Sequence, residues 1–278
     1  MEQDRQLVVK SNHIIEASYR LSVAEQRVIL SAITQVRRDQ QKVTDEVLYS
    51  VTAAELAELC GTDPKTAYRD LQNAAERLQT RRVTLHLEPD GVTIRTKRRR
   101  VTCWVQSVDY IDQEGRIELR FGKDILPYLT GLQREFTRYA LSDVAKMTSA
   151  HAIRLYELLM QWPEGHRVVD LDDLRRWLQL EDRYPSIKDL KRRVLDPAAQ
   201  QINEHSPLML TWNQRKTGRK VTHLVFDYVP KNPAKATGKA PAKRKIGKLS
   251  DAEIASQARP GESWEAARTR LNQIPLDV

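Results

Sequence analysis

Apolar residues recur at helical spacing behind two capping boxes in the first quarter of the chain. The box Ser22–Glu25 precedes apolar positions that fall on one face, which predicts a helix from about Val23 to Arg38. A second box, Thr52–Glu55, precedes a shorter apolar run that ends at Gly61, a residue suited to the left-handed C-cap of a helix. The pattern therefore predicts two helices, the second of them short.

A third helix should follow closely, with Asp63 as its N-cap and Pro64 in its first turn. Its apolar residues repeat at helical spacing and should form a buried stripe: Tyr68, Leu71, Ala75 and Leu78. Two helices about a tight turn form a helix-turn-helix, whose second helix enters a DNA groove. Its outward face would carry residue types that contact bases and phosphates, namely Lys65, Thr66, Arg69, Asn73 and Arg77.

Alternating apolar and polar residues behind this helix predict strands. Val83–Leu87 and Val92–Arg95 flank the turn Pro89–Gly91, and Val101–Val108 follows as a further strand. A helix-turn-helix followed by a hairpin is typical of a winged helix. Four cations lie between these strands and should contact phosphate as part of the wing: Lys97, Arg98, Arg99 and Arg100. The alternative is a solvated hairpin edge, because charged residues also protect exposed strands from aggregation.

A second hairpin should extend the same sheet. Its strands would run from Ser107 to Tyr110 and from Ile117 to Phe121, about a turn at Asp112–Gly115. A helix that begins near Asp124 should follow.

The order of elements then recurs. A helix through Ile153 and Leu159 leads to a turn at Pro163–Gly165, a short strand at Val168–Val169, and a helix that carries Leu171, Leu174 and Leu178. Another helix follows Ser186 and should bury an apolar stripe: Ile187, Leu190, Val194 and Ala198. Its cations would face outward as a second recognition helix: Lys188, Lys191 and Arg192. An ordinary amphipathic helix with a charged outer face is the alternative.

Two further strands, Leu208–Trp212 and Val221–Tyr228, would form a second wing. The loop predicted between them, from Asn213 to Lys220, carries cations suited to phosphate: Arg215, Lys216, Arg219 and Lys220. The fold class is therefore α+β, with two tandem winged-helix domains that form an internal repeat. We expect domains at residues 1–130 and 131–230, followed by a basic, largely disordered tail at 231–278 that holds few apolar residues over its first part.

Composition narrows the function. The 278 residues include 46 Lys and Arg against 37 Asp and Glu, and the resulting net charge of +9 favours a polyanionic partner such as nucleic acid or an anionic membrane face, between which charge alone does not choose. No long apolar run predicts a membrane span, and the charged start Met1–Arg5 is not a signal peptide, so we expect a cytoplasmic protein with no membrane partner. Cys60 and Cys103 are isolated, which disfavours a disulfide framework or a zinc site.

Motifs for catalysis are missing. The sequence holds no P-loop and no His-x-His or His-Glu-x-x-His spacing, so we expect no enzyme activity, no metal and no cofactor. The acids Asp170, Asp172 and Asp173 more often cap a helix than hold a cation. The tryptophans Trp104, Trp162, Trp177 and Trp212 lie in apolar patterns and should belong to the core rather than stack on bases.

The sequence resembles the iteron-binding plasmid replication initiators over roughly Leu7 to Tyr228. The most specific similarity lies in the opening Val8–Ala17 and the segment Leu21–Arg27 that follows it, and further similarity lies in Ser149–Leu159 and Asp189–Leu195. This resemblance implies a bacterial, plasmid-associated protein that binds origin repeats in double-stranded DNA as a monomer. It also implies recruitment of the host initiator and replicative helicase, and a homodimer, formed through the first domain, that represses the protein's own gene in plasmid copy control.

The resemblance further implies that the second recognition helix is the dominant base reader. Its best contacts would be Lys188, Lys191, Arg192 and Arg193, of which Arg193 borders the buried stripe by helical geometry. Two other functions remain open. A dimeric transcriptional repressor would use the same helices on inverted half-sites. A DNA-nicking enzyme would use a tyrosine nucleophile such as Tyr68, Tyr139 or Tyr156, although it would lack metal ligands.

Overall fold

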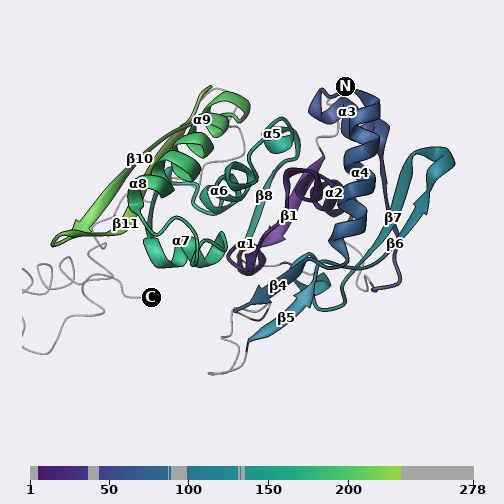
Figure 1. Cartoon of the computed structure of the whole chain (residues 1–278), viewed down its shortest axis with the longest axis horizontal. Helices are drawn as coiled ribbons and strands as arrows, with labels where there is room; N and C mark the ends of the chain where they lie inside the picture. Colours follow the sequence, from purple (N-terminus) through teal and green to yellow (C-terminus); the bar gives the residue numbers. More distant parts are fainter. Residues whose placement is uncertain are drawn as a thin grey trace, which may run out of the picture. The chain divides into compact units, whose positions relative to one another are not determined.

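The computed structural model describes residues 6–36, 44–86, 88, 99–130, 132 and 135–232 (Figure 1). The predicted tail lies outside these residues, apart from Lys231 and Asn232. None of the helices in the described part is long and apolar enough to cross a membrane.

The chain opens with β1 (Leu7–Ser11), α1 (Asn12–Ile15) and β2 (Ser18–Tyr19), followed by α2 (Val23–Thr34). The capping box of α2 is confirmed: Ser22 accepts from the backbone N–H of Glu25, and the Glu25 carboxylate accepts from that of Ser22. The predicted end near Arg38 is wrong, because the backbone N–H groups of Gln35 and Val36 donate to carbonyls three residues back and close the helix with a tight turn.

The first helix-turn-helix is formed by α3 (Ala53–Cys60) and α4 (Pro64–Leu78), preceded by β3 (Tyr49–Thr52). Thr52 and Glu55 complete the second capping box, and Gly61 ends α3 with a φ of 66°. Asp63 accepts from the backbone N–H of Thr66 as the predicted N-cap of α4. Leu71, Ala75 and Leu78 are buried as predicted, whereas Tyr68 is half-buried at the edge of the stripe.

The strand that precedes this helix-turn-helix determines which hairpin is its wing. β3 pairs with β7 (Arg116–Phe121), and β7 pairs with β6 (Val105–Ile111), in a sheet of order β3-β7-β6. The 3-10 turn η1 (Asp112–Glu114) and Gly115, with a φ of 60°, connect the hairpin. The β6–β7 hairpin is confirmed, but it does not extend the sheet of the strands before it. It is the first wing, and the prediction that those earlier strands form the wing is wrong.

The hairpin predicted as the wing belongs to another sheet. There β4 (Arg82–Leu85) pairs with β2 and with β5 (Arg100–Cys103). The single strand expected over 101–108 is divided at Trp104, whose side chain is fully buried and whose backbone N–H donates to Arg81. Packing of this indole turns the chain from one sheet into the next. The predicted turn Pro89–Gly91 and strand Val92–Arg95 lie outside the described residues.

A connecting segment follows β7. The helix expected near Asp124 is wrong: the chain forms only the 3-10 turn η2 (Leu126–Tyr128), which contains Pro127. β8 (Phe136–Ala140) then pairs antiparallel with β1, and the short helix α5 (Ser142–Ala145) precedes the second unit.

The second unit begins with α6 (Ala150–Met160), β9 (His166–Asp170) and α7 (Leu171–Trp177). Its second recognition helix consists of α8 (Ile187–Leu190), a π-helical turn η3 (Lys191–Leu195) and α9 (Asp196–His205). Long strands β10 (Leu208–Thr217) and β11 (Lys220–Pro230) form the wing. The long loop expected from Asn213 to Lys220 is wrong, because the strands continue and only Gly218 and Arg219 join them.

The predicted internal repeat is visible in the topology. In both units a helix, a strand, two helices and a hairpin occur in this order, with β4 and β5 inserted before the hairpin of the first unit. The first strand pairs with the last, giving the orders β3-β7-β6 and β9-β11-β10. This arrangement confirms the α+β class and the two tandem winged helices (Figure 1).

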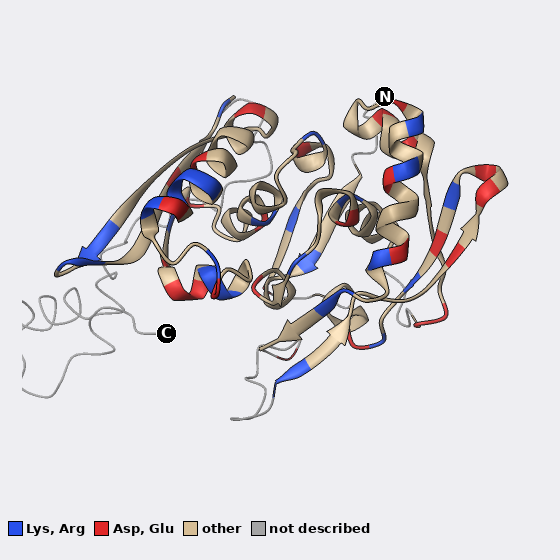
Figure 2. Ribbon diagram, in the orientation of Figure 1, with Lys and Arg blue, Asp and Glu red and all other residues tan. Residues whose placement is uncertain are grey.

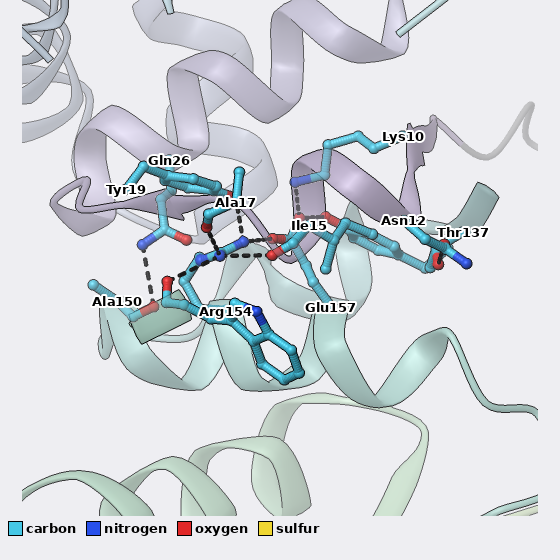
Figure 3. Close-up of polar contacts among 12 residues, drawn as sticks. Lys10, Asn12, Ile15, Ala17, Tyr19, Gln26, Thr137, Ala150, Arg154 and Glu157 are labelled. Atoms are coloured by element: carbon cyan, nitrogen blue, oxygen red, sulfur yellow. Dashed lines mark hydrogen bonds and ion pairs between the residues drawn. The ribbon is translucent and has the colours of Figure 1, made fainter. Parts of the chain in front are cut away.

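A buried ionic cluster ties the opening segment to α6 (Figure 3). Lys10 and Arg154 both form ion pairs with Glu157, and Arg154 also donates to the backbone carbonyls of Ile15 (2.7 Å) and Ala17 (3.1 Å). Burial alone would raise the pKa of the Glu157 carboxyl, but Lys10 and Arg154 outweigh it and lower that pKa. Much of the resemblance noted in the sequence falls on this cluster.

Candidate nucleic-acid interface

The outward face of α4 presents the side chains predicted from the sequence. Lys65, Arg69, Asn73 and Arg77 are exposed, and Thr66 is half-buried beside the N-cap. Lys65 and Arg69 make no ion pair with the described residues, whereas Arg77 donates to the backbone carbonyl of Asn73 at 3.0 Å. Figure 2 shows Lys and Arg at intervals along this helix, with Asp and Glu between them. This face is free to enter a groove of DNA.

The second recognition helix is widened at its centre. The backbone N–H of Asp196 donates to the carbonyl of Lys191, five residues back. Pro197 has no N–H to donate to the carbonyl of Arg193, and its ring would clash with that carbonyl in a regular α-helix. The chain relieves this conflict with one π-helical turn, a feature that often accompanies function.

The π-helical turn determines where the cations of this helix lie. Lys188, Arg192 and Arg193 are exposed, and Leu190, Val194 and Leu195 are buried beneath them. In a regular helix Arg193 would border the buried stripe, but the wider turn places its side chain at the surface.

Two of these cations have partners that orient them. The Lys191 ammonium lies 5.5 Å from the centre of the Trp212 ring on β10, a cation–π contact, and Arg192 forms an exposed ion pair with Asp189 at 3.0 Å. An exposed pair of this kind contributes at most about 1 kcal/mol, so a phosphate or base can displace Asp189. The face therefore remains able to bind an anion.

The second wing extends the cationic surface. Arg215 and Lys216 on β10, Arg219 in the turn and Lys220 on β11 are all exposed. Gly218, with a φ of 62°, permits the two-residue turn that brings strands of this length together. Figure 2 shows Lys and Arg at this end of the hairpin. Strands rather than a loop position these cations.

The first wing has the opposite character. Its turn carries Asp112 and Glu114, and Arg116 behind them is bound to Glu114 at 2.5 Å and to Glu118. Of the basic run expected there, Lys97 and Arg98 lie outside the described residues and Arg99 is exposed. Arg100 holds Glu88 through two hydrogen bonds of 2.9 Å. Arg99 and Arg100 therefore lie at the start of β5 and not on the wing.

The tyrosines considered as nucleophiles are poorly placed for chemistry. Tyr139 and Tyr156 are buried, and their hydroxyls donate to Glu157 (2.5 Å) and Asp143 (3.0 Å). Burial raises the pKa of both phenols. Tyr68 is half-buried and its hydroxyl accepts from Gln72 at 2.8 Å. The geometry does not support a DNA-nicking enzyme.

Of the acids considered for a cation, Asp170 is a helix cap and Asp173 pairs with Arg176. Asp170 accepts from the backbone N–H groups of Asp172 (2.8 Å) and Asp173 (3.3 Å) at the start of α7, as predicted. Within the described residues, no group of three or more His, Cys, Asp or Glu is arranged to hold a metal ion.

The tryptophans divide into two groups. Trp104 and Trp177 belong to the core, and Trp212 is half-buried against it. The prediction is wrong for Trp162, whose side chain is 47% exposed in the turn after α6, where Arg167 lies 5.6 Å from its ring centre.

One cationic feature has no counterpart in the sequence patterns. Arg20, Arg81, His151 and Arg154 line a common cleft between the first unit and the start of α6. Arg20 lies between β2 and α2, Arg81 follows α4, and His151 and Arg154 lie on α6, so no single pattern along the chain connects them. The only local signals are the positions of Arg20 just before the α2 capping box and of Arg81 just after α4.

Comparison with known proteins is consistent with this architecture. The family described as Initiator Replication protein matches residues 7–160 with its WH1 domain and residues 170–228 with its WH2 domain. An uncharacterized 27.6 kDa protein of Escherichia coli is 27% identical over 234 residues, covering 78% of this chain and 93% of that protein. A replication initiation protein of Escherichia coli is 26% identical over 227 residues, covering 79% of this chain and 68% of that protein.

A solved structure has the same fold. The Pi initiator protein, crystallised in complex with iteron DNA, superposes with a TM-score of 0.69 at 20% identity. The match covers 82% of this chain and 98% of that one.

Proposed function

The chain belongs to the family of initiator replication proteins built from WH1 and WH2 domains, and from this premise we propose that it binds iterons, the repeated sequences of a plasmid origin, as a monomer. The family consists of DNA-binding replication initiators and not of catalytic enzymes. The protein then acts by binding duplex DNA and neither makes nor breaks a covalent bond.

The repeated topology is the observation that carries the proposal. Each unit presents a recognition helix with exposed cations, α4 in the first and α8–α9 in the second. Two such helices in consecutive major grooves contact a site of about two turns, or ~20 bp, because one turn of B-DNA spans ~10 bp. The site is asymmetric because the two helices differ in sequence.

The proposed division of labour follows the domains predicted from the sequence. Residues 1–130 bind DNA and support dimerisation, residues 131–230 supply the main reader, and residues 231–278 form a basic tail. The proposed contacts are the predicted cations and polar residues of both units: Lys65, Thr66, Arg69, Asn73, Arg77, Lys97, Arg98, Arg99, Arg100, Lys188, Lys191, Arg192, Arg193, Arg215, Lys216, Arg219 and Lys220.

The finer parts of the proposal rest on the family resemblance. Bound monomers recruit the host initiator and replicative helicase, and dimers repress the protein's own gene. The protein acts in the bacterial cytoplasm, where plasmid DNA is located.

Selection of bound duplexes from a random pool tests the proposal. We expect an enriched asymmetric site of about two helical turns, and the mass of the complex should correspond to one protein chain per site. A palindrome bound only by two chains would indicate a dimeric repressor instead. Failure to enrich any sequence would refute sequence-specific recognition.

A pair of variants separates reading from folding. Lys191→Glu combined with Arg192→Glu reverses charge on the second recognition helix and should abolish enrichment. Arg138→Glu, an exposed arginine on β8, is the matched control and should leave the selected site unchanged. Both proteins should unfold at similar urea concentrations.

A further inference from the structure

The cleft between the first unit and α6 is formed by segments far apart in the chain. It has a volume of about 390 Å³. Its walls come from the β2–α2 segment, the end of α4, the start of α6 and the end of α7, and its polar lining residues are Tyr19, Arg20, Ser22, Gln26, Arg81, His151 and Arg154. Both helix-turn-helix units therefore contribute to one concave surface.

The lining of the cleft is cationic. Arg20 is exposed and has no ion-pair partner in the described part of the chain. Arg81 is 35% exposed at the wall, where its guanidinium holds the buried carboxylate of Glu25 through bonds of 2.8 and 2.9 Å. Of the described residues that line the cleft, none is acidic. An anion that enters meets positive charge on both sides.

Arg154 lies at the base of this surface with part of its hydrogen-bonding capacity unused. The side chain is 4% exposed, and its Nε finds no acceptor among the described residues. Its other nitrogens bond to Tyr19, to Glu157 and to backbone carbonyls (Figure 3). Arg154 thus adds positive charge beneath the cleft, part of which its ion pair with Glu157 offsets.

Two helix ends reinforce the charge. Ser22, the N-cap of α2, and Ala150, the first residue of α6, line the cleft, and the Gln26 amide joins them by donating to the carbonyl of Ala150 at 3.1 Å. Helix N-termini carry partial positive charge, part of which the Glu25 carboxylate of the capping box offsets in α2. The helices have 12 and 11 residues.

We propose that this cleft binds a backbone phosphate of the DNA segment that passes between the two recognition helices, with Arg20 and Arg81 contacting the phosphate and His151 beside it. The inference rests on the proposed function, because it requires duplex DNA to span both units. The cleft is open to solvent at Arg20, and residues next to both helix-turn-helix units line it. This position suits a DNA strand that passes from one major groove to the next. Phosphate contacts of this kind position a protein without reading sequence.

His151 provides a local reporter. Burial, followed by the charges of Arg20 and Arg183, lowers the pKa of its imidazole. The cleft cations Arg81 and Arg154 and the carboxylate of Glu25 beneath Arg81 complete its charged surroundings. A bound phosphate adds negative charge here and should raise that pKa.

Neutral phosphate analogues provide the test on the full chain. In the duplex recovered by selection, single methylphosphonates are placed along the segment between the two grooves. One of them should weaken wild-type binding roughly fivefold at 0.15 M salt, the value expected for loss of one phosphate contact. Arg20→Gln should weaken the unmodified duplex by a similar factor and make the protein insensitive to that substitution. Arg138→Gln on β8 removes an equal exposed charge and should retain full sensitivity.

A second arm separates DNA from free phosphate. Inorganic phosphate at 10 mM and the duplex are each titrated while the His151 imidazole is followed by NMR. The proposal expects its pKa to rise with the duplex and the rise to be lost in Arg20→Gln. A rise with inorganic phosphate alone, together with unchanged DNA binding of Arg20→Gln, would identify a pocket for a free anion and overturn the DNA assignment.

Failure of the cleft and failure of the proposed function give different results. If a duplex is enriched but Arg20→Gln binds it as tightly as the wild type, only the proposed phosphate contact in the cleft is refuted. If no sequence is enriched, a duplex of unrelated sequence at low salt still tests the cleft, because phosphate contacts do not depend on sequence. There Arg20→Gln should reduce the slope of log affinity against log salt by about 0.9, and an unchanged slope contradicts the inference.

Discussion

Glu157 shows how one residue can hold two distant segments together. Its carboxylate lies within an ionic cluster that includes Lys10 on β1 and Arg154 on α6, and the Glu157 side chain is only 1% exposed. Removal of one member of a buried ionic group leaves the others charged and unpaired in a medium of low polarity. The cluster is therefore sensitive to loss of any single partner.

Glu157→Gln should lower the free energy of unfolding by about 3 to 5 kcal/mol, the usual effect of breaking a buried pair. Urea unfolding measured by circular dichroism tests this. Arg176→Ala removes a partner of the exposed pair with Asp173 and should change the same quantity by less than about 1 kcal/mol. Equal effects of the two substitutions would contradict a special role for the cluster.

The same carboxyl predicts a pH dependence. Because Lys10 and Arg154 outweigh burial and hold the pKa of this carboxyl below its ordinary value in the folded protein, the unfolded chain binds the proton more tightly. The stability that Glu157 contributes is fully present above the unfolded value and is lost as the pH falls through the lower, folded value. Unfolding free energies measured across this acid range should therefore fall more steeply for the wild type than for Glu157→Gln.

At the residue scale, local signals predicted local structure. Ser22, Thr52 and Asp63 cap their helices as the sequence indicates, and Gly61 takes the left-handed conformation, because each of these roles involves neighbours within a few positions. The cleft that contains Arg20 could not be predicted, because its walls meet only in the folded chain.

The second recognition helix shows how a single proline shapes an element. Pro197 enforces the π-helical turn, and the turn places Arg193 at the surface beside Arg192. Pro197→Ala should allow a regular α-helix, which moves Arg193 toward the buried stripe. We expect DNA affinity to fall roughly tenfold, equivalent to about 1.4 kcal/mol.

Backbone chemical shifts and binding isotherms of Pro197→Ala check this prediction together. Pro233→Ala, which lies beyond the second unit, is the matched substitution and should alter neither. A regular helix with unchanged affinity would show that Arg193 does not contact DNA.

The two wings provide a second prediction at the element scale. Arg219→Gln combined with Lys220→Gln removes two cations from the second wing and should reduce the salt slope of DNA binding by about 1.8, at about 0.9 for each phosphate contact. Asp112→Asn combined with Glu114→Gln neutralises the first wing's tip and should leave that slope unchanged. A large change in the salt slope for Asp112→Asn combined with Glu114→Gln would mean that the acidic wing contacts DNA.

Strand pairing explains why the first wing was assigned incorrectly from the sequence. Alternation predicts that a segment is a strand but not which partner it pairs with. Here β7, which follows the helix-turn-helix in the chain, pairs with β3, which precedes it. The break at Trp104 is equally nonlocal, since the indole packs edge-on against Tyr19 with ring centres 4.9 Å apart. In the second unit the wing follows its recognition helix directly, and the strands there were predicted, although too short.

At the scale of the whole molecule, the contacts between the two units determine how both units bind one DNA site. Arg167 on β9 pairs with Glu16 at 2.8 Å, Ser18 donates to the carbonyl of Arg176 on α7, and Arg154 reaches both Ala17 and the carbonyl of Trp177. These contacts are largely buried and join the opening segment to the second helix-turn-helix. Independent rotation of the units would break all of them.

The junction therefore predicts how the protein responds to spacing within its DNA site. Insertion of ~5 bp between the two contacted grooves places them on opposite faces of the duplex, and insertion of ~10 bp restores the face but not the distance. If the junction holds the units at one separation, both insertions should reduce affinity to that of a single unit, measured by titration of labelled duplexes. Recovery with ~10 bp would mean that the units separate and that the buried contacts of Arg154 open on DNA. In that case Glu157→Gln, which weakens those contacts, should recover more affinity than the wild type on the site with the ~10 bp insertion. A fixed junction predicts that the wild type recovers no affinity on that site.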